Sequence, residues 1–88
     1  MLLSKKAQED LEGIRRGAPK TATRILHKLD MLEKNPRRRM PGVKRLKTAD
    51  TYRLRVGDYR VLFTITGEVI IIQRIVHRKD AYQVWREA

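Results

Sequence analysis

Apolar residues recur with the period of an α-helix through the first third of the chain. Along the segment of residues 4–16 and the residue before it, Leu3, Ala7, Leu11 and Ile14 are spaced by four and three residues, and charged residues fill the other face. A second segment follows a Gly-Ala-Pro turn and carries one apolar stripe, made of Ala22, Ile25, Leu26, Leu29 and Leu32. This periodicity predicts two amphipathic helices, and the short connection predicts that they form an antiparallel hairpin.

Residues typical of helix ends flank both segments. Ser4 suits the N-cap of the first helix, because its hydroxyl can accept a hydrogen bond from a free backbone N–H of the first turn. Gly17 suits the left-handed residue that ends a helix, and Pro19 suits the first turn of the next one. The second helix is expected to end at Asn35-Pro36, since the residue before a proline avoids the helical region.

From Tyr52 onward the period changes from helical to alternating. Tyr52, Leu54 and Val56 alternate with arginines, as in a strand with one buried face. Gly57-Asp58 is typical of a two-residue hairpin turn, so the chain is expected to return as a strand over residues 59–65.

The remaining segments complete the predicted fold. A turn near Gly67 leads into a third strand over residues 68–77, residues 43–46 are a candidate short strand, and residues 80–87 are expected to form a short helix. Helices followed by a meander of strands indicate the α+β class. We therefore expect one domain, residues 1–88, in which the N-terminal helical hairpin packs on a twisted antiparallel sheet of three to four strands.

A two-residue turn at Gly57-Asp58 would fix which side chains share a face of the first hairpin. Arg55 would lie opposite Arg60, and residues directly opposite share a face of the sheet. Arg53, Arg55 and Arg60 would then gather on one face, and the other face would meet the helices with Tyr52, Leu54, Val56, Tyr59, Val61 and Phe63. Like charges placed opposite each other destabilise a sheet, whereas clustered guanidinium groups are suited to bind a phosphate. An ordinary solvated basic face is the alternative interpretation.

The turn near Gly67 leaves the next register open. A two-residue turn at Thr66-Gly67 would place Gln73 opposite Arg60 and bring His77 to the arginine face. A three-residue turn at Thr66-Gly67-Glu68 would place Arg74 opposite Arg60 and bring Arg78 there instead. Either register brings one titratable or cationic side chain to the end of the arginine face.

Charge and composition narrow the class of partner. The 88 residues include 21 Lys and Arg against 10 Asp and Glu, a net charge of +11, and no cysteine. Disulfides and cysteine-based zinc sites are thereby excluded, no cofactor is expected, and the apolar runs are too short for a membrane span. The segment of residues 34–47 contains seven cations and no acid: Lys34, Arg37, Arg38, Arg39, Lys44, Arg45 and Lys47. A soluble cytoplasmic protein with a polyanionic partner, nucleic acid or an acidic protein, is the expectation.

Two motifs in this order resemble those of a known family. Tyr-Arg-Leu-Arg-Val-Gly-Asp-Tyr-Arg-Val at 52–61, followed by an apolar strand and His-Arg-Lys-Asp-Ala-Tyr at 77–82, is similar to the RelE/ParE superfamily of bacterial toxins, and to its RelE branch in particular. The likeness extends along the whole chain, although only residues 1–3 precede the first helix, where the family usually has a longer strand. The resemblance implies the compact RelE fold, metal-independent cleavage of messenger RNA in the ribosomal A site, and an acidic cognate antitoxin.

Residue by residue, the resemblance implies a candidate catalytic set of Arg60, Arg78, Tyr82 and His77. The two arginines would stabilise the charge of the transition state, Tyr82 would act as a base if nearby cations stabilise its phenolate, and His77 would act as base or acid. The simpler interpretations are that Tyr82 packs on the edge of the sheet and that His77 is a surface residue. Candidate RNA-binding residues are Arg53, Arg55, Lys44, Arg45, Lys47, Arg37, Arg38 and Arg39.

Two other functions fit the same sequence. A ParE-like toxin would poison DNA gyrase without catalysis, and a catalytically silent basic domain would only bind RNA or the ribosome. The arginine cluster together with the segment from His77 to Tyr82 favours the nuclease.

Overall fold

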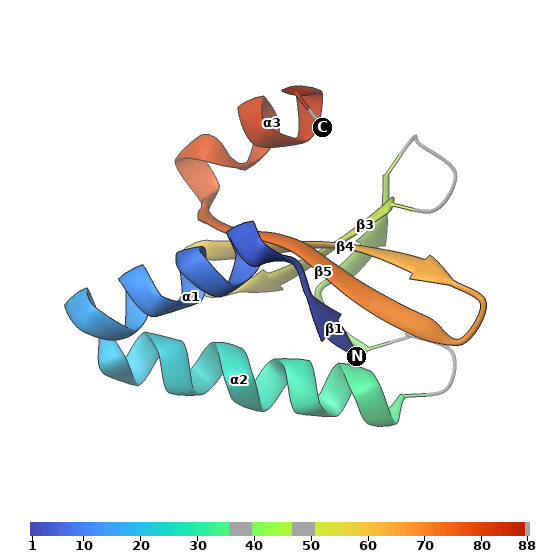
Figure 1. The fold of residues 1–88 in the computed structure, drawn as a ribbon, viewed down its shortest axis with the longest axis horizontal. Coiled ribbons are helices and arrows are strands. Elements are labelled where there is room, and N and C mark those ends of the chain that lie inside the picture. The colour runs from blue at the N-terminus through green and yellow to red at the C-terminus, as the bar shows by residue number, and fades with distance from the viewer. Residues whose placement is uncertain (36–39, 47–50, 88) are drawn as a thin grey trace.

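The computed structural model describes residues 1–35, 40–46 and 51–87 and confirms the α+β class. Its elements are β1 (Leu2–Leu3), α1 (Lys5–Gly17), α2 (Pro19–Lys34), β2 (Val43–Arg45), β3 (Thr51–Val56), β4 (Tyr59–Thr66), β5 (Val69–His77) and α3 (Arg78–Glu87). Helices α1 and α2 lie side by side beneath the sheet, and α3 lies on its opposite face (Figure 1). The predicted helical hairpin, hairpin strands and C-terminal helix are therefore all present.

The sheet has one more strand than expected, and that strand is parallel. The strand order is β1-β5-β4-β3-β2, in which Leu2 and Leu3 of β1 pair in parallel with Ile71 and Ile72 of β5. All other neighbouring strands are antiparallel. A two-residue strand is too short to show an alternating pattern, so the sequence could not reveal it.

The helix ends agree with the sequence at three of four positions. The Ser4 hydroxyl accepts a hydrogen bond from the backbone N–H of Ala7 at 3.1 Å, Pro19 begins α2, and α2 ends at Lys34, next to its cap Asn35. The expected left-handed Gly17 is wrong: it is the last residue of α1, and Ala18 caps that helix with a φ of −147° and a ψ of 70°. The Ala18 N–H bonds the carbonyl of Ile14, so the turn closes without a positive φ.

The hydrophobic core lies between the helical hairpin and the sheet. Its most deeply buried side chains come from both layers: Phe63, Ile25, Leu32, Leu54, Ile70, Ile72, Ile75 and Val61. Tyr52 and Tyr59 pack against its margin, so the predicted apolar face of the first hairpin is confirmed. Leu26, expected in the buried stripe of α2, is instead 50% exposed.

A β-bulge sets the register between β4 and β5. The turn consists of Gly67 and Glu68, because Thr66 pairs with Val69, and the register shifts beside Leu62 and Phe63. Both expected registers are therefore wrong, and Val76 lies opposite Arg60. Two causes combine. The turn begins at Gly67, one residue later than expected, which alone would place Ile75 opposite Arg60. One extra residue on β5, which an alternating pattern does not specify, then moves the partner on to Val76.

Within the described ranges, no helix combines the length and the apolar content that crossing a bilayer requires.

Candidate active site

The sheet face opposite the helical hairpin carries a row of cations. The Gly57-Asp58 turn has the predicted two-residue form, so Arg55 pairs with Arg60 and Arg53 with Leu62. Lys44 of β2 pairs with Arg53 and joins the same face. The predicted arginine face is confirmed, and it extends over three adjacent strands.

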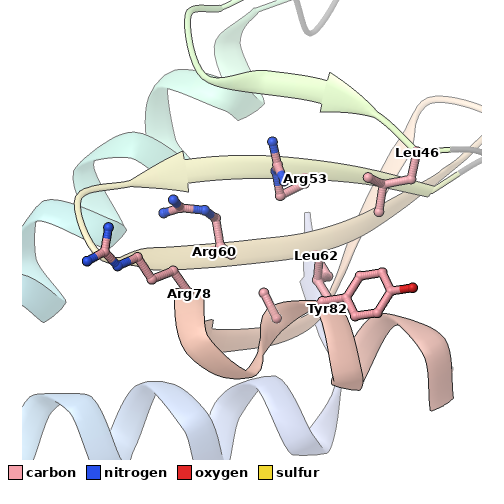
Figure 2. Close-up of a pocket in the computed structure, with 7 residues that line it drawn as sticks. Leu46, Arg53, Arg60, Leu62, Arg78 and Tyr82 are labelled. Carbon is pink, nitrogen blue, oxygen red and sulfur yellow. The ribbon is translucent and has the colours of Figure 1, made fainter.

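A pocket lies between this face and α3. It encloses about 270 Å³ and is lined by Leu46, Arg53, Arg60, Leu62, Arg78, Ala81 and Tyr82. In Figure 2 the guanidinium groups of Arg60 and Arg78 lie toward one end, and Leu46 and the Tyr82 ring lie at the other. The pocket therefore has a cationic end and an apolar end, a combination that is suited to a phosphate attached to a planar organic group.

Arg60 is held at the cationic end by its own hairpin. Its Nη1 donates to the carbonyl oxygen of Gly57 at 2.8 Å and to that of Tyr59 at 2.9 Å. Burial, and after it the nearby charges of Arg53, Arg55 and Arg78, lower the pKa of Arg60 below its ordinary value. Four guanidinium groups thus repel one another here, and a bound anion would relieve that repulsion.

Arg78 is the first residue of α3 and lies at the pocket beside Arg60. Its backbone N–H donates to the carbonyl of Asp58 at 2.7 Å, which anchors the start of the helix to the hairpin turn. Its Nε lies 3.8 Å from the Asp58 carboxylate, and both side chains are exposed. An ion pair this exposed contributes little to the stability of the fold. A phosphate can therefore replace the carboxylate as the partner of Arg78.

Arg53 supplies a further unsatisfied donor to the pocket. Its Nε is buried, and no group in the described part of the chain accepts a hydrogen bond from it. A buried donor without an acceptor costs about 1–3 kcal/mol.

Tyr82 lines the pocket from α3 and is 65% exposed. Its ring closes the apolar end, and in Figure 2 its hydroxyl is directed away from the guanidinium groups of Arg60 and Arg78. Tyr82 is therefore brought to the same pocket as the arginines, with its ring nearer to the guanidinium groups of Arg60 and Arg78 than its hydroxyl oxygen.

His77 is not among the pocket residues. It pairs with Tyr59 on the opposite face of the sheet, where the two rings meet edge to face at 5.5 Å between centroids. Its Nδ1 accepts the backbone N–H of Lys79 at 3.2 Å. The bulge in β5 places His77 on this face and Arg78 on the other.

The other predicted RNA-binding residues fall into three groups. Lys44 and Arg55 lie on the arginine face, and Arg45 pairs with Tyr52 and so belongs to the opposite one. Outside the described residues lie Arg37, Arg38, Arg39 and Lys47.

Sequence reasoning missed Leu46, Leu62 and Ala81 as pocket residues. The sequence did contain one signal for them: Leu62 lies on the cationic face, and an apolar residue there indicates that another element packs over it.

Comparison with known proteins places these features in a family. Residues 1–82 match the family described as the ParE toxin of the type II toxin-antitoxin system, parDE. Over 31 residues the chain is 48% identical to Toxin RelE3 of Methanocaldococcus jannaschii, a match that spans 35% of this chain and 35% of that protein.

Solved structures support the same assignment along the whole fold. The RelB-RelE antitoxin-toxin complex from Methanococcus jannaschii contains a chain that superposes with a TM-score of 0.79 at 25% identity, covering 97% of this chain and 99% of that one. A chain of the YoeB-YefM complex from Staphylococcus aureus has the same fold, with a TM-score of 0.74 at 21% identity over 86% of this chain and 92% of that one. The protein belongs to the ParE toxin family of type II toxin-antitoxin systems, within the RelE/ParE superfamily.

Proposed function

We propose that this toxin is an endonuclease that cleaves messenger RNA in the ribosomal A site and thereby stops translation in the cytoplasm. The observation that carries the proposal is the pocket that Arg53, Arg60 and Arg78 line together with Tyr82. An interaction that only blocks a partner does not require several guanidinium groups to line one pocket. The likeness to RelE toxins supports the same activity.

The proposed reaction is attack of a ribose 2′-hydroxyl on the adjacent phosphorus. The 2′-oxygen loses its proton to a base and forms a bond to phosphorus, the bond to the 5′-oxygen breaks, and an acid protonates that oxygen. The products are a 2′,3′-cyclic phosphate and a 5′-hydroxyl. Arg60 and Arg78 stabilise the additional negative charge on the phosphorane, a contribution for which one well-placed donor is worth about 10²–10³ in rate.

Tyr82 is our candidate for the base. Its exposed side chain can change rotamer on a picosecond to nanosecond timescale, which would turn the hydroxyl toward the arginines. A phenol is a poor base at neutral pH unless cations stabilise its phenolate, and the arginine end of the pocket provides them. His77 would reach the reaction only through a rearrangement of β5, so we assign it no step.

The flanking cations would bind neighbouring phosphates of the message. Lys44 and Arg55 continue the arginine face beyond the pocket, and Arg37, Arg38, Arg39, Arg45 and Lys47 are further candidates for ribosome or RNA contacts. Each neutralised phosphate releases counterions, so binding would weaken steeply with salt. The acidic cognate antitoxin would compete for the same face.

The product ends test the proposal. Purified protein is added to ribosomes stalled with a defined codon in the A site, and the message fragments are mapped and their termini analysed. Cutting within the A-site codon that leaves a 2′,3′-cyclic phosphate and a 5′-hydroxyl is the expected result. Intact message, or cutting that occurs equally on naked RNA, would overturn it.

Gyrase poisoning is the second candidate, because the matched family model is that of ParE. It predicts gyrase-dependent DNA breaks together with intact message. The Tyr82→Phe variant separates the two, since loss of one hydroxyl abolishes general-base catalysis and leaves a purely blocking interaction nearly unchanged.

A further inference from the structure

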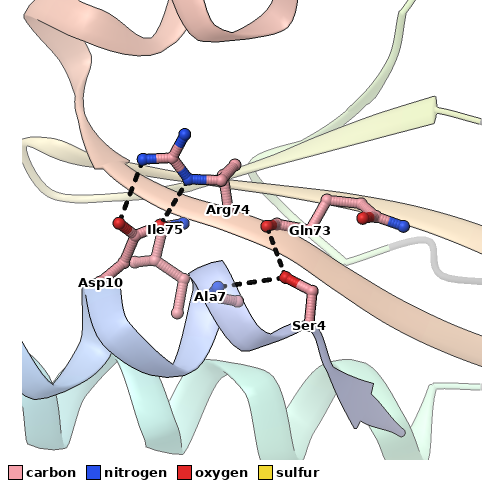
Figure 3. Close-up of polar contacts among 6 residues, drawn as sticks. All are labelled: Ser4, Ala7, Asp10, Gln73, Arg74 and Ile75. Atoms are coloured by element: carbon pink, nitrogen blue, oxygen red, sulfur yellow. Dashed lines mark hydrogen bonds and ion pairs between the residues drawn. The ribbon is translucent and has the colours of Figure 1, made fainter.

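Beyond the short strand β1, the outer edge of β5 is held by α1. The Ser4 N–H donates to the carbonyl of Ile72 at 2.9 Å, and the Ser4 hydroxyl donates to that of Gln73 at 2.8 Å. Two turns further along α1, the Asp10 carboxylate accepts the backbone N–H of Ile75 at 2.9 Å. These contacts follow one another along the strand (Figure 3).

They mark the position of the β-bulge. In a regular strand the backbone groups of successive residues face opposite edges, yet the carbonyls of Ile72 and Gln73 both face α1. Gln73 is the extra residue, because Phe63 pairs with Ile72 and Leu62 with Arg74. After the bulge, Ile75 instead of Arg74 or Val76 directs its N–H to this edge.

The bulge decides which side chains reach the pocket. A strand alternates with period two, so continuing from the buried Ile72 without a bulge would turn Val76 and Arg78 toward the helical hairpin. It would also turn His77 toward the arginine face. With the bulge, Ile75 returns to the core, Val76 lies opposite Arg60, and Arg78 follows on the pocket side.

Asp10 holds the bulge by three hydrogen bonds on one carboxylate. Besides the Ile75 N–H, it accepts from Arg74 Nε at 2.8 Å and from Arg74 Nη2 at 3.2 Å. The Asp10 side chain is only 17% exposed, and a bidentate guanidinium-carboxylate pair fixes orientation as well as distance. A β5 strand without the bulge would break all three of these hydrogen bonds at once.

We propose that Asp10, on α1 and remote from the pocket residues, is a positioning residue that keeps Arg78 in the pocket by locking the bulge of β5. The proposal goes beyond the nuclease function and rests on it only for the kinetic readout below. It assigns to the first helix a role in the geometry of the site on the opposite face of the sheet.

A double-mutant cycle provides the kinetic test. Asp10→Ala is expected to slow A-site cleavage by about 10²-fold, the loss that a displacement of about 1 Å causes. In an Arg78→Ala background the same change is expected to have almost no further effect, because the residue through which it acts is gone. An equal loss in both backgrounds would show a general structural role and overturn the proposal. Glu12→Ala, on the exposed side of α1, is the control and should leave the rate unchanged.

A second readout does not require the protein to be a nuclease. NMR of the wild-type chain is expected to show cross-strand proton contacts between Arg60 and Val76 and a slowly exchanging Ile75 amide. Asp10→Ala should weaken both, whereas Asp10→Asn, which keeps an acceptor for Ile75, should retain them in large part and carry the test if the alanine variant does not fold. Unchanged contacts and exchange in Asp10→Ala would contradict the proposal. If the wild type cuts no message but Asp10→Ala changes the register of β5, the proposed nuclease function is overturned and the positioning role of Asp10 stands.

Discussion

Replacing Arg55 by glutamine should stabilise the fold while weakening its binding to RNA. Arg55 is exposed on β3 and lies directly opposite Arg60 on β4, and its charge is one of those that lower the pKa of Arg60. Glutamine keeps much of the length of the side chain and removes the charge. The variant therefore isolates the repulsion within the arginine face from the packing of the hairpin.

The expected gain follows from the pairing. Like charges directly opposite each other in an antiparallel pair destabilise it by an amount within the range of about 0.2–1 kcal/mol. For a domain of this size, each kcal/mol moves the melting temperature by about 4–8 °C, so an increase of about 1–8 °C is expected. Raising the salt from about 0.1 M to about 1 M shortens the Debye length from about 10 Å to about 3 Å, and most of the gain should vanish.

Thermal denaturation at both salt concentrations measures the shift in melting temperature, and urea denaturation measures the free energy of unfolding, with Lys20→Gln as the control. Lys20 is exposed on α2, on the other side of the sheet from the arginine face. The control should change the free energy of unfolding little at either salt concentration. A destabilised Arg55→Gln variant, or a gain that does not depend on salt, would show that the arginines do not repel one another in the folded state.

Three further predictions concern the core, the first helix and acid stability. Phe63→Ala should destabilise the protein by about 3–5 kcal/mol, measured by urea denaturation, because this ring is fully buried between the two layers; a loss below about 1 kcal/mol would contradict the assigned core. Ser4→Ala should cost about 0.5–2 kcal/mol, since the hydroxyl caps α1 and also bonds Gln73, and Ser4→Thr should recover most of it in the same assay. The Arg15 guanidinium holds the pKa of Glu12 below its ordinary value of 4.5. The ion pair therefore stabilises the fold above pH 4.5, and its contribution is lost as the pH falls through the lowered pKa. A Glu12→Gln variant whose unfolding midpoint equals that of the wild type at every pH would refute this.

The register of the first hairpin could be predicted because local chemistry determines it. The Gly57-Asp58 turn allows a two-residue connection, with Gly57 at a φ of +56°, and the alternation on both sides of the turn then assigns every side chain to a face. The pairing of Arg55 with Arg60 follows from those two facts alone.

The register of β5 could not be predicted from alternation, because it depends on contacts with a distant helix. Asp10 and Ser4 lie more than 60 residues from the strand they hold, and no local pattern reports such contacts. One trace was present in the sequence: the core residues Ile70, Ile72 and Ile75 are spaced by two and then three residues, and that change of spacing is typical of a bulge.

The pocket could not be predicted from the sequence, because it depends on where α3 lies. The sequence assigned arginines to one face of the sheet, but the apolar end depends on how the last helix crosses that face. The bond from the Arg78 N–H to the Asp58 carbonyl sets the start of the helix. Leu62 and Ala81 then meet in the pocket, and Tyr82 follows on the next position of α3.

We expect the guanidinium groups at the cationic end to stabilise the transition state of a phosphodiester cleavage. The single-turnover rate of message cutting on programmed ribosomes tests this for Arg60→Ala, compared with Lys20→Ala at equal folded fraction. A fall of about 10²–10³-fold is expected for the first variant, and an unchanged rate for the second. Equal rates for both variants would show that the arginine pocket takes no part in the chemistry.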